Sequence, residues 1–233
     1  IFLRAFRPLK KLLKNNPPDI FILHLITSLP LLLNFIFSFN TSVILRISGL
    51  PKLNVIRMLL WKITLKKVLC ITSPTQATLE NIKKLGFNKN IFLLHDPIIL
   101  VSEIIKKNNN KNQKSKNNYV AIGRLTKQKN FIFLIKCFKK IIEKNIDIKL
   151  YILGEGEDRK KLQDLILINK LGDNIFLEGH QSNVYKYLKN ADAFILSSLW
   201  EDPGFVLVEA FYSNTIVISS DCKNGPLEIL KNG

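Results

Sequence analysis

The chain has 233 residues, 47% of them hydrophobic, so it can bury the core of one large domain or of two modest ones. Its formal net charge is +17, but 29 of the 35 basic residues are lysine and only 6 are arginine. Nucleic-acid surfaces favour arginine, whose planar fork binds phosphates and bases. The composition therefore indicates solvated surface lysines, or attraction to an anionic membrane surface, and we expect no nucleic-acid partner.

The cysteines and the chain ends bear on location and completeness. The chain has three cysteines that lie far apart and form no CxxC pair: Cys70, Cys137 and Cys222. This pattern predicts a protein of the reducing cytoplasm and excludes an obvious zinc site. The first residue is Ile1 rather than methionine, and Gly233 falls within a polar turn. We therefore expect a fragment of a longer product that lacks both ends.

The opening stretch, residues 2–16, is expected to form an amphipathic helix. Phe2, Phe6, Leu9 and Leu13 share one face, and lysines and arginines occupy the rest. Packing of the apolar face against a sheet is one interpretation. Binding to an anionic membrane surface is the other.

Residues 20–39 are long and apolar enough to be considered as a membrane span, but polar residues and Pro30 interrupt them. They are better interpreted as a buried strand over 20–25 and a buried helix that begins near Pro30. Ser73 is expected to cap a helix that ends at Gly86. The other elements expected in this half are strands over 42–48, 68–73 and 90–97 and a helix over 54–67.

Residues 106–118 contain no apolar side chain and are the predicted linker between two domains, over residues 1–105 and 119–233. The alternation of strands and helices restarts after the linker. Strands are expected over 119–123, 148–154, 174–179, 193–198 and 215–220, with helices over 131–142, 159–172, 184–191 and 205–212. This alternation predicts an α/β fold of two Rossmann-like domains, each on a parallel sheet, that face each other across a cleft.

A glycine or small polar residue follows nearly every strand of the second half, as close approach of the backbone to a phosphate or sugar requires. Gly123, Arg124 and Lys129 follow the first of these strands, just before a helix begins. Two cations beside a helix amino terminus can neutralise a nucleoside diphosphate. A metal would need a carboxylate cluster such as Asp-x-Asp, which the sequence lacks, so we expect no metal and no cofactor. The alternative is that Arg124 and Lys129 are ordinary surface charges.

Two glutamates, Glu201 and Glu209, lie on either side of a break at Pro203 and Gly204, where a helix is expected to begin. Glu209, one to two turns into that helix, can accept two hydrogen bonds from a vicinal diol such as a ribose. Glu201 is placed to meet the hydroxyls of a second sugar. With an anion site between them, these carboxylates predict a nucleotide-sugar pocket. A glycosidase acid/base pair is the alternative, but it gives no role to the basic residues upstream.

Five segments carry a resemblance to a known family: GRLTKQKNFIFLIKCF, YILGEGEDRKKL, IFLEGH, ADAFILSSLWEDPGFVLVEA and VISSDCKNGPLEIL. Their order and spacing resemble the group 1 glycosyl transferases, retaining enzymes of the GT-B fold whose donor domain carries glutamate, seven residues and glutamate. The resemblance covers most of residues 119–233 and is weaker over residues 1–100. It implies that the first domain is the acceptor side, incomplete here, and the second the donor side.

The resemblance also implies a role for each predicted site residue. Arg124 and Lys129 would bind the donor diphosphate. Glu209 would hold the nucleotide ribose, and Glu201 would contact the transferred sugar. The residues expected to be catalytic are Glu201, Arg124 and Lys129. The other positions expected to bind the donor are Gly123, Gly179, Gly204 and Phe205.

The activity that the resemblance implies is transfer of a sugar from a nucleoside-diphosphate sugar to a glycan or lipid-linked glycan, with retained configuration. The segment DCKNGPLEIL is most similar to members that build bacterial surface polysaccharides from UDP-N-acetylhexosamines. A UDP-linked hexose or N-acetylhexosamine is therefore the expected donor. We expect a cytoplasmic protein with peripheral contact at the inner face of the cell membrane. The alternative is a non-catalytic sugar-nucleotide-binding or scaffold subunit.

Three departures from the family pattern stand out. Asp202-Pro203-Gly204 replaces the Gly-Phe-Gly of many members. Residues 46–49 are Arg-Ile-Ser-Gly where many members carry a histidine, and His24, on an earlier strand, is expected to be a core or rim histidine. The glycine-rich first loop of the acceptor domain and the closing carboxyl-terminal segments are also missing, which puts turnover by the fragment itself in doubt.

Overall fold

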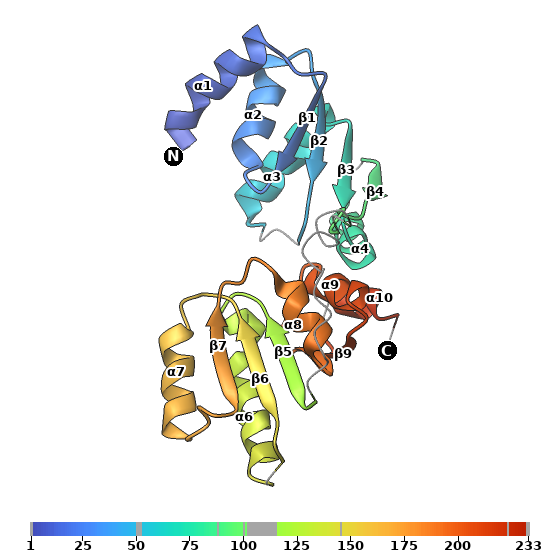
Figure 1. Ribbon diagram of the computed structural model, residues 1–233. Coiled ribbons are helices and arrows are strands. Elements are labelled where there is room, and N and C mark those ends of the chain that lie inside the picture. The colour runs from blue at the N-terminus through green and yellow to red at the C-terminus, as the bar shows by residue number, and fades with distance from the viewer. Residues whose placement is uncertain are drawn as a thin grey trace. The chain divides into compact units, whose positions relative to one another are not determined.

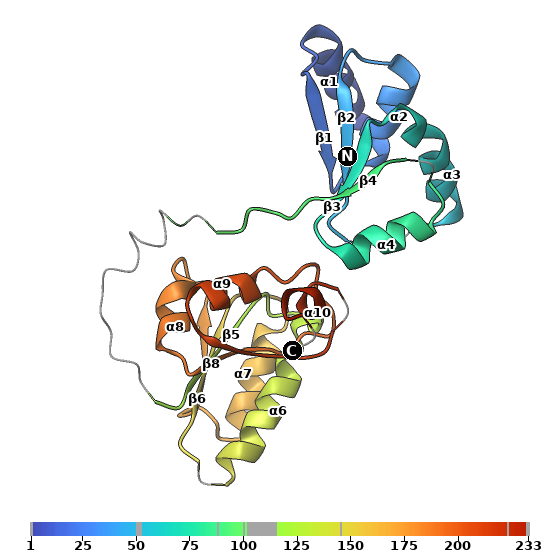
Figure 2. The same ribbon diagram turned by 90° about the vertical axis from the view of Figure 1, so that its right-hand side faces the viewer.

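The chain forms two compact units, Ile1–Asp96 and Pro97–Gly233. Figures 1 and 2 show that each unit has its own parallel sheet with helices packed against it. The residues that the computed structural model describes are 2–49, 53–87, 89–99, 101, 116–144, 146–222 and 224–231.

The sheet of the first unit has four parallel strands in the order β1-β2-β3-β4. The strands are β1 (Ile20–His24), β2 (Ser42–Arg46), β3 (Cys70–Ser73) and β4 (Ile91–Leu93). The helices are α1 (Phe2–Asn15), α2 (Ser28–Phe37), α3 (Val55–Thr64), the short 3-10 helix η1 (Leu65–Lys67) and α4 (Gln76–Lys84). One core joins Leu23, Leu45 and Ile71 of the strands to Trp61 and Ile82 of the helices.

Residues 20–39 form a strand and a helix, as predicted. Strand β1 ends at His24, and α2 begins at Ser28, two residues before Pro30. Leu31 and Leu33 of α2 are buried, which accounts for the apolar run. In the described part of the chain, no helix is both long and apolar enough to cross a membrane.

The prediction that Ser73 caps α4 is wrong. Thr75 caps it, and its hydroxyl oxygen accepts a hydrogen bond from the backbone N–H of Thr78 at 3.2 Å. Ser73 is the last residue of β3 and donates its own hydroxyl to the carbonyl of Thr75. Both residue types suit a helix start, and the two-residue turn after the strand decides which of them serves.

The sheet of the second unit has five parallel strands in the order β7-β6-β5-β8-β9. The strands are β5 (Asn118–Ile122), β6 (Lys149–Leu153), β7 (Ile175–Gly179), β8 (Ala193–Leu196) and β9 (Ile216–Ser219). The helices are the short 3-10 helix η2 (Lys127–Lys129), α6 (Phe131–Ile142), α7 (Arg159–Ile168), α8 (Val184–Asn190), α9 (Val206–Tyr212) and α10 (Pro226–Ile229).

The central strands of the second unit's sheet, β5, β6 and β8, pack against helices on both faces. Successive strand residues point to opposite faces, so Ala121 joins a core with α6 and α7, while Val120 joins a core with α8 and α9. Figure 2 shows these helix pairs on the two sides of the sheet. Burial on both faces explains why the strands are continuous apolar runs rather than alternating ones.

The strand order of the second unit reverses between β5 and β8. From β5 the chain proceeds to β6 and β7 on one side, and from β8 it proceeds to β9 on the other. In open parallel sheets, ligands bind beyond the carboxyl ends of the strands at such a reversal. The predicted α/β fold is confirmed. That the two units face each other across a cleft stays a prediction.

Most of the predicted linker, residues 106–115, lies outside the described residues. The predicted linker ends at Asn118, but Asn118 is the first residue of β5, so the predicted end of the linker is wrong by one residue. The two compact units divide between Asp96 and Pro97, before the predicted linker begins.

Candidate active site

A buried ion pair lies where the strand order of the second unit reverses. Lys129 ends η2, in the loop after β5, and Glu201 lies in the loop after β8. Lys129 Nζ and Glu201 Oε1 are 2.5 Å apart, and only 14% and 5% of the two side chains are exposed. The hydroxyl of Ser198 donates a second hydrogen bond to Glu201 Oε1. A cation and a hydroxyl thus compensate this carboxylate for the loss of water around it.

Hydrogen bonds to the backbone fix the two loops to each other. The backbone N–H of Leu199 donates to the carbonyl of Gln128 at 2.8 Å, and the Gln128 side-chain amide donates to the carbonyl of Trp200 at 2.9 Å. The Ser197 hydroxyl donates to the carbonyl of Lys129 at 2.7 Å. These three hydrogen bonds join the loop after β5 to the loop after β8 and so hold Lys129 and Glu201 close to each other. Sequence reasoning missed this role of the two serines, although their place at a strand end was visible.

Gly123 makes room for the Lys129 side chain. A Cβ atom at position 123 would lie 2.6 Å from Lys129 Cε and 2.9 Å from its Cδ. The lysine stem therefore runs directly over the glycine before its ammonium reaches Glu201. We expected a glycine here for the approach of a ligand, and in this structure it allows the approach of the cation.

Glu209 lies in the first turn of α9, earlier in the helix than predicted, because the helix begins at Val206 and not at Gly204. Partial burial raises the pKa of the Glu209 carboxyl, while a hydrogen bond from Tyr185 lowers it. The Tyr185 hydroxyl lies 3.5 Å from Glu209 Oε1. A carboxylate with one long hydrogen bond keeps accepting capacity for further hydroxyls, as a ribose site needs.

The segment between the two glutamates makes a tight turn with a cis peptide bond between Asp202 and Pro203. Gly204 has a φ of 87°, a left-handed conformation that favours glycine, and a Cβ there would lie 3.4 Å from Glu201 Cγ. Burial of its carboxyl and the negative charge of Glu201 raise the pKa of Asp202 to about 6. Phe205 follows with 39% of its surface exposed.

Arg124 and Gly179 lie at the same edge of the sheet but outside the ion pair. Arg124 is exposed, and within the described residues its side chain makes no hydrogen bond or ion pair. Gly179 ends β7, two strands from β5, and its carbonyl accepts from the backbone N–H of Gly154 at 2.7 Å. Its neighbour is Glu155, whose Oε1 a Cβ at position 179 would approach to 2.9 Å.

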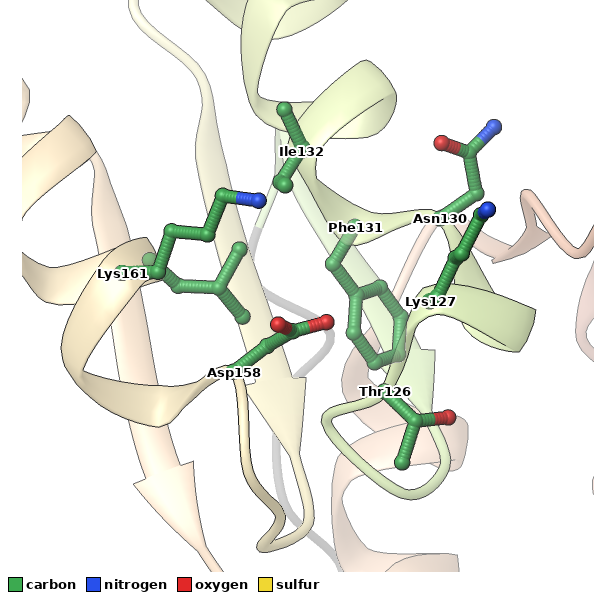
Figure 3. Close-up of a pocket in the computed structure, with 8 residues that line it drawn as sticks. Thr126, Lys127, Asn130, Phe131, Ile132, Asp158 and Lys161 are labelled. Carbon is green, nitrogen blue, oxygen red and sulfur yellow. The ribbon is translucent and has the colours of Figure 1, made fainter.

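A cavity of about 420 Å³ opens beside this edge, between the starts of α6 and α7. Figure 3 shows Asp158 and Lys161 on one side of it and Lys127 and Phe131 on the other. The residues that line it are Thr126, Lys127, Asn130, Phe131, Ile132, Asp158, Lys161 and Leu162. None of the predicted site residues is among them, and the sequence analysis did not predict this cavity.

The described residues contain no group of three histidine, cysteine, aspartate or glutamate side chains placed to hold a metal ion. The sequence closest to a metal-binding cluster is Glu155 to Asp158. In it, Glu155 Oε1 forms an ion pair with Arg159 Nη1 at 2.8 Å. Independence of a metal stays a prediction.

Residues 102–233 match the family model described as Glycosyl transferases group 1, and this match covers more than half of the chain. The chain belongs to the group 1 glycosyl transferase family. The resemblance found in the sequence is thereby confirmed at the level of the family.

Individual relatives of this group 1 glycosyl transferase share part of its length. Over 112 residues the chain is 49% identical to an uncharacterised glycosyltransferase of Methanocaldococcus jannaschii, in an alignment that covers 48% of this chain and 28% of that protein. Over 110 residues it is 34% identical to the N-acetylgalactosamine-N,N'-diacetylbacillosaminyl-diphospho-undecaprenol 4-alpha-N-acetylgalactosaminyltransferase of Campylobacter jejuni, with 47% and 29% covered.

Solved structures match both units of the chain. A Staphylococcus aureus TarM mutant, in complex with fondaparinux, alpha-GlcNAc-glycerol and UDP, superimposes with a TM-score of 0.77 at 22% identity, covering 97% of this chain and 46% of that one. The pneumococcal O-GlcNAc transferase GtfA, in complex with UDP and GlcNAc, superimposes with a TM-score of 0.73 at 18% identity, covering 96% and 45%. These similarities show the GT-B fold. The chain spans less than half the length of all four relatives.

Proposed function

We propose that the full-length protein transfers a sugar from a UDP-linked hexose or N-acetylhexosamine to a glycan or lipid-linked glycan, with retained configuration, in the synthesis of a bacterial surface polysaccharide. Relatives named for such steps support this proposal. They include enzymes named for amylovoran, capsular polysaccharide and poly(ribitol-phosphate) substrates or products. Two related structures contain UDP.

The observation that carries the proposal is the buried pair of Lys129 and Glu201 at the strand reversal. A cation and a carboxylate held together there form a site that is neutral as a whole but polar at both ends. A donor diphosphate would share the Lys129 ammonium, and Arg124, on the same loop, would add a second cation. Glu201 would then have an oxygen available for the hydroxyls of the sugar.

In the proposed reaction, the bond between the anomeric carbon and the β-phosphate oxygen breaks as the acceptor oxygen bonds to the same face of the sugar. The acceptor proton leaves with the nucleoside diphosphate. Arg124 and Lys129 offset the charge that grows on the β-phosphate, which is the main catalytic effect that we assign to this chain. Glu201 orients the sugar and favours positive charge at the anomeric carbon. Glu209 holds the ribose.

Retention is supported by the names of relatives. Three are named for alpha-linked transfer, to an N-acetylgalactosaminyl, a poly(ribitol-phosphate) and a poly(glycerol-phosphate) acceptor. Common UDP-hexoses are α-linked, so an α-linked product means retained configuration. Proton NMR of the product tests this step, and a β-linked product from an α-linked donor would refute it.

Turnover of radiolabelled UDP-sugars by the full-length protein tests the proposed function. Glu201→Gln and Glu209→Gln should each lower the transfer rate or the donor affinity by roughly 10- to 100-fold, as loss of a charge-assisted contact does. Normal turnover by both variants would end the assignment. Donor binding without any product, with or without acceptors, would favour the second candidate, a non-catalytic subunit. That candidate is kept because residues 46–49 lack the histidine that many family members carry there.

The amino-terminal helix bears on contact with a membrane. Leu13 is buried, and Phe6 meets Phe37 of α2 edge to face at 6.4 Å, so part of the apolar face packs within the first unit. Arg7 and Lys11 on the other face are exposed. We therefore propose contact with an anionic inner membrane face through charge rather than through insertion. Failure of the protein to bind anionic vesicles at low salt would refute this contact.

A further inference from the structure

The two partners of Glu201 bind the same oxygen of its carboxylate. The Lys129 ammonium lies 2.5 Å from Oε1, and the hydroxyl of Ser198 donates to that atom as well. Within the described residues, the other oxygen, Oε2, accepts no hydrogen bond. Each carboxylate oxygen has about two lone-pair sites, so the protein fills Oε1 and leaves the capacity of Oε2 to a ligand.

The Ser198 hydroxyl gives the carboxylate of Glu201 its orientation. The terminal torsion of a glutamate side chain has only a broad, two-fold preference, so its partners must set the plane of the carboxylate. An ammonium is a compact charge with three donors, and it can sit between both oxygens. A hydroxyl has a single proton and binds one oxygen. Ser198 is only 2% exposed, so little water can compete for that proton.

Ser220, the first residue after β9, holds Ser198 in place. Its hydroxyl donates to the backbone carbonyl of Ser198 at 2.6 Å. Its backbone N–H donates to the carbonyl of Leu196, the last residue of β8, at 2.8 Å. The backbone of Ser198 is therefore tied to the neighbouring strand, and the orientation of Glu201 depends on three strand ends, those of β5, β8 and β9.

The bond from Ser198 matters most once a donor is bound. In the proposed function, the diphosphate would compete with Glu201 for the Lys129 ammonium, because both are anionic. The Ser198 hydroxyl is neutral and already bonded, so the phosphates do not draw it away. Ser198 is then the partner that keeps Oε1 turned toward the protein.

We propose that Ser198 is a positioning residue for Glu201, and that Ser220 acts through Ser198. Together they hold Oε1 inward and direct Oε2 to the hydroxyls of the donor sugar. This inference rests on the proposed function, because the direction of Oε2 affects the reaction only if Glu201 meets the sugar. It gives the two serines an effect on the sugar and none on the nucleotide.

The test separates contact with the sugar from contact with the nucleotide. In the full-length protein, Ser198→Ala should lower kcat/KM for the UDP-sugar that the wild type uses about tenfold, the effect of losing one hydrogen bond to a charged group. UDP alone has no sugar to meet Oε2, so its dissociation constant, measured by calorimetry, should change by less than about twofold. A merely structural role of Ser198 would weaken both.

Ser220→Ala tests whether Ser220 acts through Ser198. Alone it should lower kcat/KM about threefold, since it loses a neutral hydrogen bond, and it should add nothing when Ser198 is already alanine. Ser219→Ala is the matched control, because the Ser219 hydroxyl also bonds to a backbone carbonyl, that of Ser220, but does not contact Ser198. It should transfer sugar like the wild type.

Three results would overturn the positioning role. They are transfer by Ser198→Ala equal to that of Ser219→Ala, a loss of UDP affinity as large as the loss of transfer, and effects of Ser198→Ala and Ser220→Ala that simply add. Each can occur in a protein whose wild type transfers sugar from a UDP donor, and then the proposed function stands. A wild type that transfers sugar from no UDP donor would overturn the proposed function, and this inference with it.

Discussion

The ion pair of Lys129 and Glu201 makes a quantitative prediction about stability. Lys129→Met keeps the length of the side chain but removes its charge, which leaves the Glu201 carboxylate with only the Ser198 hydroxyl. Removal of one partner from a buried pair costs about 3–5 kcal/mol, and because Lys129 keeps 14% exposure we expect about 3 kcal/mol. With a urea m-value of about 2 kcal/mol per molar, the unfolding midpoint should fall by roughly 1.5 M.

The double variant Lys129→Met/Glu201→Gln removes both charges and should be more stable than Lys129→Met alone. The expected coupling between the two positions is about 2 kcal/mol. Urea unfolding followed by circular dichroism measures all three variants, with Lys127→Met, an exposed lysine of the same short helix, as the control. If Lys129→Met costs no more than Lys127→Met, or if the two changes simply add, the pair is not the buried contact described above.

Other predictions concern the same edge of the sheet. Tyr185→Phe removes the hydrogen bond that lowers the pKa of Glu209, so that pKa should rise further. The same change should weaken UDP binding several-fold, as isothermal titration calorimetry can measure. Burial and the charge of Glu201 raise the pKa of Asp202 to about 6, so between about pH 4 and 6 the folded protein binds a proton that the unfolded chain releases. The free energy of unfolding should therefore fall as the pH rises through that window. In urea titrations, Asp202→Asn should be more stable than the wild type at pH 7 but not at pH 4. Gly123→Ala should displace Lys129, because the new Cβ would lie 2.6 Å from Lys129 Cε, and should lower donor affinity at least tenfold without unfolding the protein. Addition of EDTA should leave donor turnover unchanged, and a loss that Mg²⁺ restores would refute metal independence.

The alternation of apolar runs and helices was enough to predict the architecture. Parallel sheets covered on both faces need continuous apolar strands, and this periodicity is visible in β5 to β9 without any structure. Turn residues with a fixed backbone role were also readable, as at Gly204. The exact helix starts were not, because Thr75 and Ser73 have similar capping chemistry and only the geometry of the turn separates them.

The site was predicted in part, for reasons that lie in side-chain geometry. Residues after parallel strands must gather at one edge, so the presence of both Lys129 and Glu201 at that edge follows from the sequence, but their contact with each other does not. The sequence does not show which of the two cations in the loop, Arg124 or Lys129, pairs with Glu201. Lys129 does so because its stem runs over Gly123, while Arg124, one residue from that glycine, stays in solvent. The hydrogen bond from Ser198 to Glu201 likewise depends on side-chain geometry that the sequence does not show.

The most direct test of the central claim is the affinity of the full-length protein for UDP-N-acetylglucosamine, or for the UDP-sugar that a thermal-shift screen selects, measured by calorimetry on three single variants. The account predicts that Arg124→Ala and Lys129→Ala raise the dissociation constant at least tenfold, while Lys127→Ala, from the same loop, leaves it unchanged. Equal effects of all three substitutions, or no effect of the first two, would contradict a donor site at the reversal of the sheet.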